Sequence, residues 1–177
     1  TALAAANAIV TVAKTPQGWM QQLVTVVEQP NVKRVHQIRD TGKIYLRAQA
    51  HFGLAALALY QATVDERWLQ LVRGIVAELE QNLLDPSLGG FFAAPASAVD
   101  AIVGRRKSLE DNAVAARLLY WLGVLDKDPL LKEQAVTTIR ATATPAIVRH
   151  EGRVTGNLAL TLELLTAGYV EFSVVGE

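Results

Sequence analysis

Two adjacent carboxylates, Glu110 and Asp111, are the residues best suited to chemistry, and they lie directly before an apolar run that starts at Asn112. Glycoside hydrolysis uses two carboxyl groups on either side of the scissile bond, one of them as a general acid. Neighbours in a helix point in different directions, so this pair cannot straddle a bond by itself. The other buried helices offer only Glu163 as a second carboxylate. The alternative is that Glu110 and Asp111 cap a helix start or complement its dipole.

A basic cluster, Arg105-Arg106-Lys107, precedes these carboxylates. Arginine and lysine donate charge-assisted hydrogen bonds, so the cluster could bind an anionic group such as a sugar phosphate or a carboxylate. The simpler interpretation is a solvated loop or a salt bridge to Glu110 and Asp111, because charged residues are usually exposed.

Polar residues at predicted helix starts suggest a ligand pocket. Gln49, Asn112 and Asn157 would lie near the starts of buried helices and could line it together, although Asn is also an ordinary N-cap. No residue is assigned a catalytic role. The residues expected to contact a ligand are Arg47, Gln49, Arg106, Lys107, Glu110 and Asn112.

No metal or cofactor is predicted. The sequence has no cysteine, which excludes disulfides, thiol catalysis and cysteine zinc sites. His36, His51 and His150 are too scattered for a metal site, and His51, on an apolar helix, is expected to line the core or a cavity. Gly89-Gly90 lacks the strand–glycine–helix spacing of a phosphate loop and is expected to form a turn.

Composition excludes two classes of partner. The 177 residues include 17 basic and 17 acidic ones, so no basic excess exists for nucleic acid. The longest apolar stretch, Phe52 to Tyr60, is far short of the roughly 20 residues that span a membrane. The Ala-rich start at Thr1 has no charged leader, and Val170 to Val175 alternates like an interrupted strand. We therefore expect a single helical domain over residues 1–177, cut from a longer multidomain chain.

Periodicity predicts helices that are alternately buried and half-exposed. Tyr45 to Thr63 is apolar nearly all round, whereas Glu66 to Leu84 has one apolar stripe and a charged face. The same contrast between a buried helix and a half-exposed helix is expected in two further pairs of helices. The remaining expected helices are Ala2–Ala13, Pro16–Glu28, Asn112–Leu125, Pro129–Thr142 and Gly156–Ala167.

The connections favour helical hairpins. Thr15-Pro16, Asp65-Glu66 and Asp128-Pro129 each place a capping side chain before a helix. Two connections are longer: Pro30 to Lys43 is expected to hold a short strand pair, and Asp85 to Ser108 a β excursion. The predicted fold is all-α, a partial (α/α) toroid of antiparallel helical hairpins with short β excursions in the loops.

A resemblance to a known family covers most of residues 45–176. The sequence resembles the helical C-terminal region of thioredoxin-domain-containing proteins of the spermatogenesis-associated thioredoxin-like family, which is similar to the six-hairpin glycosidases and N-acylglucosamine 2-epimerases. The resemblance implies a toroid preceded by a thioredoxin-like domain, which is not found within these 177 residues. It is carried by the order and spacing of Ala62–Leu69, Gly89–Phe92, Arg105–Lys107, Asp111–Ala116 and Val174–Gly176.

Departures from the family pattern bear on function. Arg47-Ala48-Gln49-Ala50 stands where the family resembles Asp-Asp-Tyr-Ala, and Glu110-Asp111-Asn112-Ala113 lacks the family's Pro-Ser step. These losses favour a non-catalytic module of a thioredoxin-domain-containing protein, serving as an interaction or ligand-binding scaffold. The alternative is a carbohydrate-active domain, glycosidase-like or epimerase-like, with a pocket at the N-terminal ends of the inner helices. The expected partners are the rest of its own chain or a second copy, and a sugar ligand.

Overall fold

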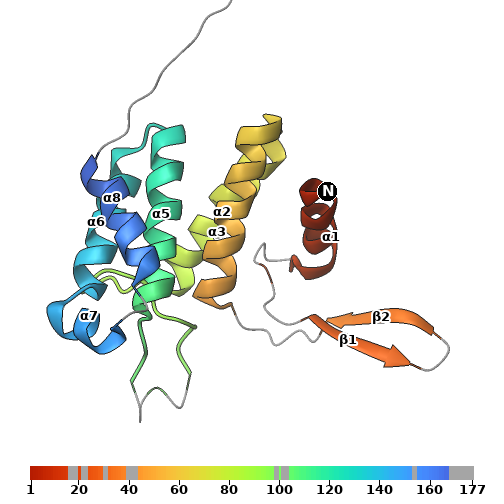
Figure 1. Ribbon diagram of the computed structural model, residues 1–177, viewed down its shortest axis with the longest axis horizontal. Helices are drawn as coiled ribbons and strands as arrows, with labels where there is room; N and C mark the ends of the chain where they lie inside the picture. Colours follow the sequence, from red (N-terminus) through yellow and green to blue (C-terminus); the bar gives the residue numbers. More distant parts are fainter. Residues whose placement is uncertain are drawn as a thin grey trace, which may run out of the picture.

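The fold is a set of helical hairpins with one separate β-hairpin (Figure 1). The computed structural model describes residues 1–15, 20, 24–29, 32–38, 44–97, 100, 104–152 and 155–167. The predicted all-α class is confirmed. The elements are α1 (Ala2–Ala13), β1 (Val24–Gln29), β2 (Val32–Ile38), α2 (Leu46–Thr63), α3 (Glu66–Asn82), α5 (Leu109–Leu125), α6 (Pro129–Thr142), α7 (Pro145–Glu151) and α8 (Gly156–Ala167).

The helices form an inner and an outer layer. Helix α2 packs against both α3 and α5, and α5 also packs against α6 and α8. Helices α2, α5 and α8 therefore stand side by side as the inner layer, and α3 and α6 lie outside it (Figure 1). This two-layer arrangement confirms the predicted partial toroid. The expected alternation of buried and half-exposed helices is wrong for α8, of which only Leu158 and Thr161 are buried.

Local capping explains where the outer helices begin. A side-chain oxygen of Asp65 accepts a hydrogen bond from the backbone N–H of Arg67 at 3.1 Å, and Asp128 accepts one from Leu130 at 2.8 Å. Pro129 follows its cap at the first helical position. These two predicted helix starts are confirmed.

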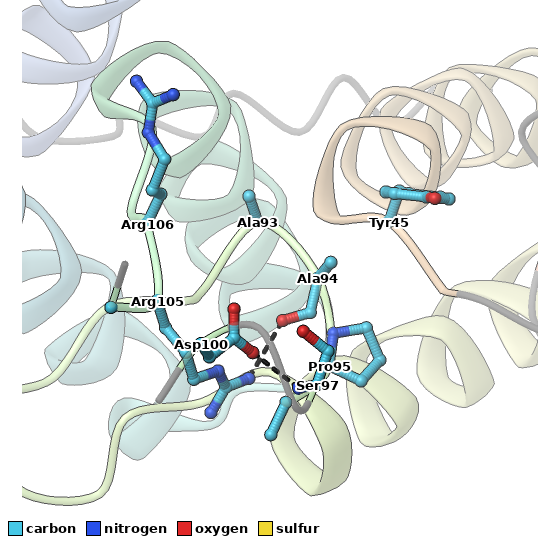
Figure 2. A pocket seen from close by; sticks show the side chains of 10 residues that line it. Tyr45, Ala93, Ala94, Pro95, Ser97, Asp100, Arg105 and Arg106 are labelled. Atoms are coloured by element: carbon cyan, nitrogen blue, oxygen red, sulfur yellow. Dashed lines mark hydrogen bonds between the residues drawn. The ribbon is translucent and has the colours of Figure 1, made fainter. Parts of the chain in front are cut away.

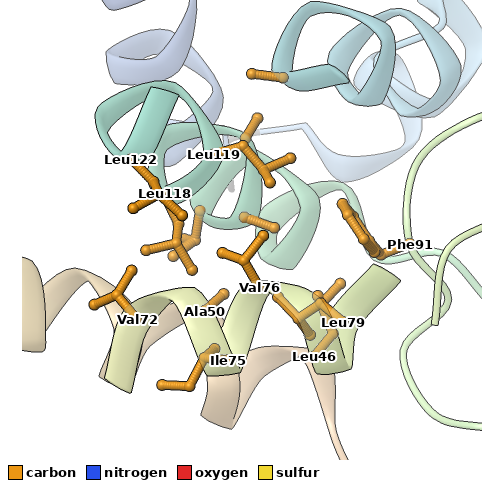
Figure 3. Packing of buried hydrophobic residues seen from close by; sticks show 14 of the residues in the cluster. Leu46, Ala50, Val72, Ile75, Val76, Leu79, Phe91, Leu118, Leu119 and Leu122 are labelled. Carbon is orange, nitrogen blue, oxygen red and sulfur yellow. The ribbon is translucent and has the colours of Figure 1, made fainter. Parts of the chain in front are cut away.

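The core is centred on α5 and its contacts with α2 and α3 (Figure 3). Leu118 and Leu119 of α5 are fully buried, which explains why this helix is apolar nearly all round. Gly53 allows α2 to approach closely, because a Cβ at this position would lie 2.6 Å from Cδ2 of Leu118. Phe91 closes one end of the core from the loop that follows α3.

The expected helix over Pro16–Glu28 is wrong for its described part. Val24–Gln29 is a strand that pairs antiparallel with Val32–Ile38. The run Val-Thr-Val-Val that opens β1 is β-branched, and such residues favour strands over helices. The strand pair expected within Pro30–Lys43 therefore begins earlier, at Val24. Residues 16–19, where the expected helix starts, lie outside the described residues.

Other segments differ in smaller ways. Helix α7 was not predicted, although Thr144-Pro145 carries the same capping signal as the other helices: Oγ1 of Thr144 accepts from Ile147 at 3.4 Å. In the long loop after α3, an isolated bridge pairs Leu84 with Phe91. Residues 101–103 of the expected β excursion, and the expected strand at Val170–Val175, lie outside the described residues. Within the described part of the chain, no helix is long and apolar enough to cross a membrane.

Candidate functional site

The first turns of the three inner helices bring charged and amide side chains together. Arg47 lies in the first turn of α2, Glu110 and Asp111 in that of α5, and Asn157 in that of α8. Arg117, two turns further along α5, reaches back to Asn157. We call these five residues the inner-helix cluster.

One contact in the cluster joins α2 to α5. Nε of Arg47 donates to Oδ1 of Asp111 at 2.8 Å; the Asp111 side chain is only 9% exposed and that of Arg47 is 62% exposed. The hydrogen bond and the negative charge of Asp111 raise the pKa of Arg47. An ion pair with one exposed partner adds little to stability. Its effect is to hold the Asp111 carboxylate toward α2, away from a role as a free acid.

A second set of contacts joins α5 to α8. The amide Nδ2 of Asn157 donates to Oε1 of Glu110, and its Oδ1 accepts from Nη2 of Arg117 at 2.6 Å. Oε2 of Glu110 and Nε of Arg117 are buried and have no hydrogen-bond partner among the described residues. Burial lowers the pKa of Arg117, and the charge of Glu110 opposes part of that shift. Buried polar atoms without partners are costly, which sets Glu110 and Arg117 apart from the paired side chains around them.

A pocket of about 420 Å³ opens near the start of α2 (Figure 2). Tyr45 lines one side of it, and Arg105 and Arg106 line the other. The loop that forms the pocket is tied to α2, because the backbone N–H of Leu46 donates to the carbonyl of Ala93 at 3.0 Å. The pocket therefore lies at the same end of the inner helices as Arg47.

The three residues of the basic cluster make different contacts. Nζ of Lys107 donates to Oδ2 of Asp85 at 2.7 Å and to the carbonyl of Gly89 at 2.6 Å. Arg105 donates to a loop carbonyl and stacks 3.7 Å from the ring centroid of Phe92. Arg106 is exposed on the pocket wall. Of the three basic residues, Arg106 is the one best placed to meet a ligand.

Two of the predicted pocket residues bind backbone instead. The amide of Gln49 is buried, where its Oε1 accepts from the N–H of Met20 at 2.9 Å and its Nε2 donates to the Met20 carbonyl. The amide of Asn112 clamps Phe91 in the same way, at 2.7 Å and 2.9 Å. These side chains hold the loops that frame the site rather than lining a pocket.

Two residues have a different position or role in the structure from the one expected from the sequence. Arg117 is the one charged residue within the apolar run from Asn112 to Leu125, and a charge in a buried helix is itself a signal of a special role. His51 was expected to line the core or a cavity, but it is exposed, one turn beyond Arg47 on the same side of α2. Within the described residues, no group of three or more His, Asp or Glu side chains could hold a metal ion.

Comparisons with known proteins bear on the fold. No protein-family model matches the sequence, and no curated protein matches it. A family 76 glycoside hydrolase from a bovine Bacteroides thetaiotaomicron strain aligns with 60% of this chain and 24% of its own, at 16% identity and a TM-score of 0.50. A GH76 alpha-mannanase from Bacteroides thetaiotaomicron aligns with 60% of this chain and 30% of its own, at 21% identity and a TM-score of 0.51.

The chain thus spans less than a third of the length of each of these two enzymes. At such low identity the likeness shows the fold alone. It lends no support to the resemblance to thioredoxin-domain-containing proteins. The chain has an all-α toroid fold similar to that of the family 76 glycoside hydrolases, which is the six-hairpin glycosidase-like fold.

Proposed function

We propose that this chain is a carbohydrate-binding domain whose sugar ligand binds at the N-terminal ends of α2, α5 and α8. The observation that carries the proposal is the pair of buried, unpartnered polar atoms in the inner-helix cluster, Oε2 of Glu110 and Nε of Arg117. A carboxylate oxygen accepts and a guanidinium N–H donates, and sugar hydroxyls do both. Arg47 and Arg106 supply further donors at the same end of the helices.

The fold supports a sugar ligand over other small molecules. Both solved structures that align with the chain are glycoside hydrolases of family 76, and one is an alpha-mannanase. Mannose is therefore the first sugar to test.

Glycoside hydrolysis is the second candidate, and it depends on a second carboxylate. Asp111 is engaged by Arg47, so Glu163 of α8 is the remaining choice. Glu163 lies on α8, six residues beyond Asn157, the partner of Glu110. An inverting mechanism requires its two carboxyl groups to lie about 6.5–9.5 Å apart. In this mechanism Glu110 would be the acid and Glu163 the base.

A thermal-stability screen against mannose, glucose, sugar phosphates and uronic acids tests binding. A ligand at tenfold its dissociation constant stabilises a fold by about 1.4 kcal/mol, which is a Tm rise of about 3–6 °C for a chain of this size. The shift should disappear in Glu110→Gln and persist in Glu133→Gln, a matched change on the exposed face of α6. An absence of any shift, or equal shifts in both variants, would reject the site.

Release of reducing sugar from mannobiose separates binding from hydrolysis. If the chain hydrolyses its ligand, Glu163→Gln should abolish release while the Tm shift induced by the monosaccharide mannose remains. If it only binds, no release occurs in the unmutated protein either. If the chain binds no sugar, an interaction scaffold remains as the other candidate function.

A further inference from the structure

A groove of about 350 Å³ runs along the contact between α5 and α8. We call it the seam groove. It is lined by Arg117 and Trp121 of α5 and by Leu160, Glu163, Leu164 and Ala167 of α8. Arg117 belongs both to this groove and to the inner-helix cluster, so the groove continues from the site described above.

We propose that the seam groove binds the second residue of an oligosaccharide whose first residue binds at the inner-helix cluster. This inference rests on the proposed function. It adds that the ligand is an oligosaccharide rather than a single sugar, and that it lies along the α5–α8 seam toward the C-terminal ends of these helices.

The lining has the chemistry that a sugar ring requires. A pyranose presents an apolar C–H face and a polar edge of hydroxyls. Trp121 offers a half-buried aromatic surface, and its ring is held edge-to-face by Tyr120, with centroids 5.8 Å apart and planes at 82°. A ring held in this way loses little conformational freedom when a ligand stacks on it.

Groups for the hydroxyl edge lie in the same groove. Arg117 provides N–H donors and Glu163 provides carboxylate acceptors, from opposite helices. Leu160, which is 53% exposed, extends the apolar floor beside Trp121. A few polar groups around an apolar surface are the usual composition of a small-molecule site.

The position of the groove sets the order of the sugar residues. Glu110 and Arg117 are seven residues apart on α5, which is about 10.5 Å along the helix axis. Asn157 contacts both side chains and so spans the boundary between the two subsites. A single sugar at Glu110 would leave Trp121 and Glu163 without contacts to it, whereas a disaccharide extending along α5 would reach them.

The experiment compares monosaccharides with their disaccharides. Dissociation constants are measured by titration calorimetry for mannose, glucose and N-acetylglucosamine, and for mannobiose, maltose, cellobiose and chitobiose. We expect at least one disaccharide to bind about tenfold or more tightly than its monosaccharide. In Trp121→Leu this gain should vanish while the dissociation constant of the monosaccharide stays unchanged.

Two further variants serve as checks. Glu163→Gln alters an exposed side chain of the groove and should reduce the disaccharide gain even if Trp121→Leu fails to fold. Leu162→Ala changes a leucine that is 42% exposed on α8 but does not line the groove, and it should leave both constants unchanged. Tryptophan fluorescence in a Trp19→Phe background gives a direct signal, because Trp68 is 3% exposed and Trp121 lies at the ligand.

The outcomes separate this inference from the proposed function. Glu110-dependent binding of a monosaccharide with no gain for any disaccharide overturns the seam groove and leaves the proposed function intact. No binding of any sugar overturns both. A concentration-dependent dimer that Trp121→Leu or Glu163→Gln dissociates would also overturn the inference, because the groove would then be an interface with a second copy.

Discussion

Asn157 of α8 donates its side-chain amide to Glu110 of α5, 47 residues earlier in the chain. The same amide accepts from Arg117 through its oxygen. One neutral side chain thus bridges a carboxylate and a guanidinium. The other oxygen of Glu110, Oε2, has no partner among the described residues and lies at the end of the inner helices where we place the sugar.

Asn157→Ala should weaken both stability and sugar binding. It removes the partner of Oε1 of Glu110 and that of Nη2 of Arg117, and a part-buried group left unsatisfied costs about 1–3 kcal/mol. Urea unfolding measures the loss. Asn82→Ala is the control, because the Asn82 amide bonds, among the described residues, only to Glu78 within α3 and its loss should cost less. Equal losses in the two variants would contradict the bridging role.

Asn112→Ala should destabilise the fold by about 2 kcal/mol or more. The N–H and the carbonyl of Phe91 are both held by the buried Asn112 amide, and each buried group left unsatisfied costs about 1–3 kcal/mol. Chemical denaturation measures the change. Asn112→Asp keeps the acceptor for the N–H of Phe91 but not the donor to its carbonyl, so it should be intermediate if this clamp holds the loop. A change below about 0.5 kcal/mol in Asn112→Ala would show that the clamp is dispensable.

Stability should depend on Asp85 in a pH-dependent way. The hydrogen bond from Lys107, with those from Ser87 and Leu88, holds the pKa of Asp85 well below its usual range. A carboxyl whose pKa is lower in the folded state stabilises the fold above the unfolded pKa of about 3.9, and loses this effect as the pH falls through the folded value. Asp85→Asn should therefore lower Tm at pH 7, and the gap to the unmutated protein should narrow below about pH 4.

Thermal unfolding between pH 7 and pH 3 tests this dependence. Glu133→Gln, which is exposed and has no ion pair among the described residues, should track the unmutated protein at each pH. A gap for Asp85→Asn that stays constant down to pH 3 would mean that the charge of Asp85 does not stabilise the loop.

Two glycines should respond to alanine in opposite directions. At Gly53 a Cβ would lie 2.6 Å and 2.9 Å from the two methyl carbons of the buried Leu118, so Gly53→Ala should destabilise by about 1–3 kcal/mol. At Gly74 on α3 no neighbouring atom lies within 4 Å of the position that a Cβ would take. Gly74→Ala should therefore stabilise the fold by about 0.5–1 kcal/mol through helix propensity. Paired denaturation curves measure both changes. A stabilising Gly53→Ala would mean that α2 and α5 are less tightly packed than described.

The helical hairpins were predictable because their signals are local. Asp65 and Asp128 cap helices within two residues of themselves, and apolar periodicity separates the inner helices from the outer ones. The same reasoning failed at Val24–Gln29, where an apolar run of β-branched residues fits either a helix or a strand. Pairing with Val32–Ile38 is what makes this run a strand.

By itself, the sequence determined the class of the fold and the end of the inner helices at which polar residues gather. The tertiary structure alone decided what each polar side chain does. The side-chain amide of Gln49 bonds to the backbone of a residue 29 positions away, and that of Asn112 to the backbone of a residue 21 positions away. Glu110 and Arg117 both bond to Asn157, which lies 47 and 40 residues later in the chain. Hydrogen-bond partners at such separations depend on how helices pack, which no local pattern in the chain records.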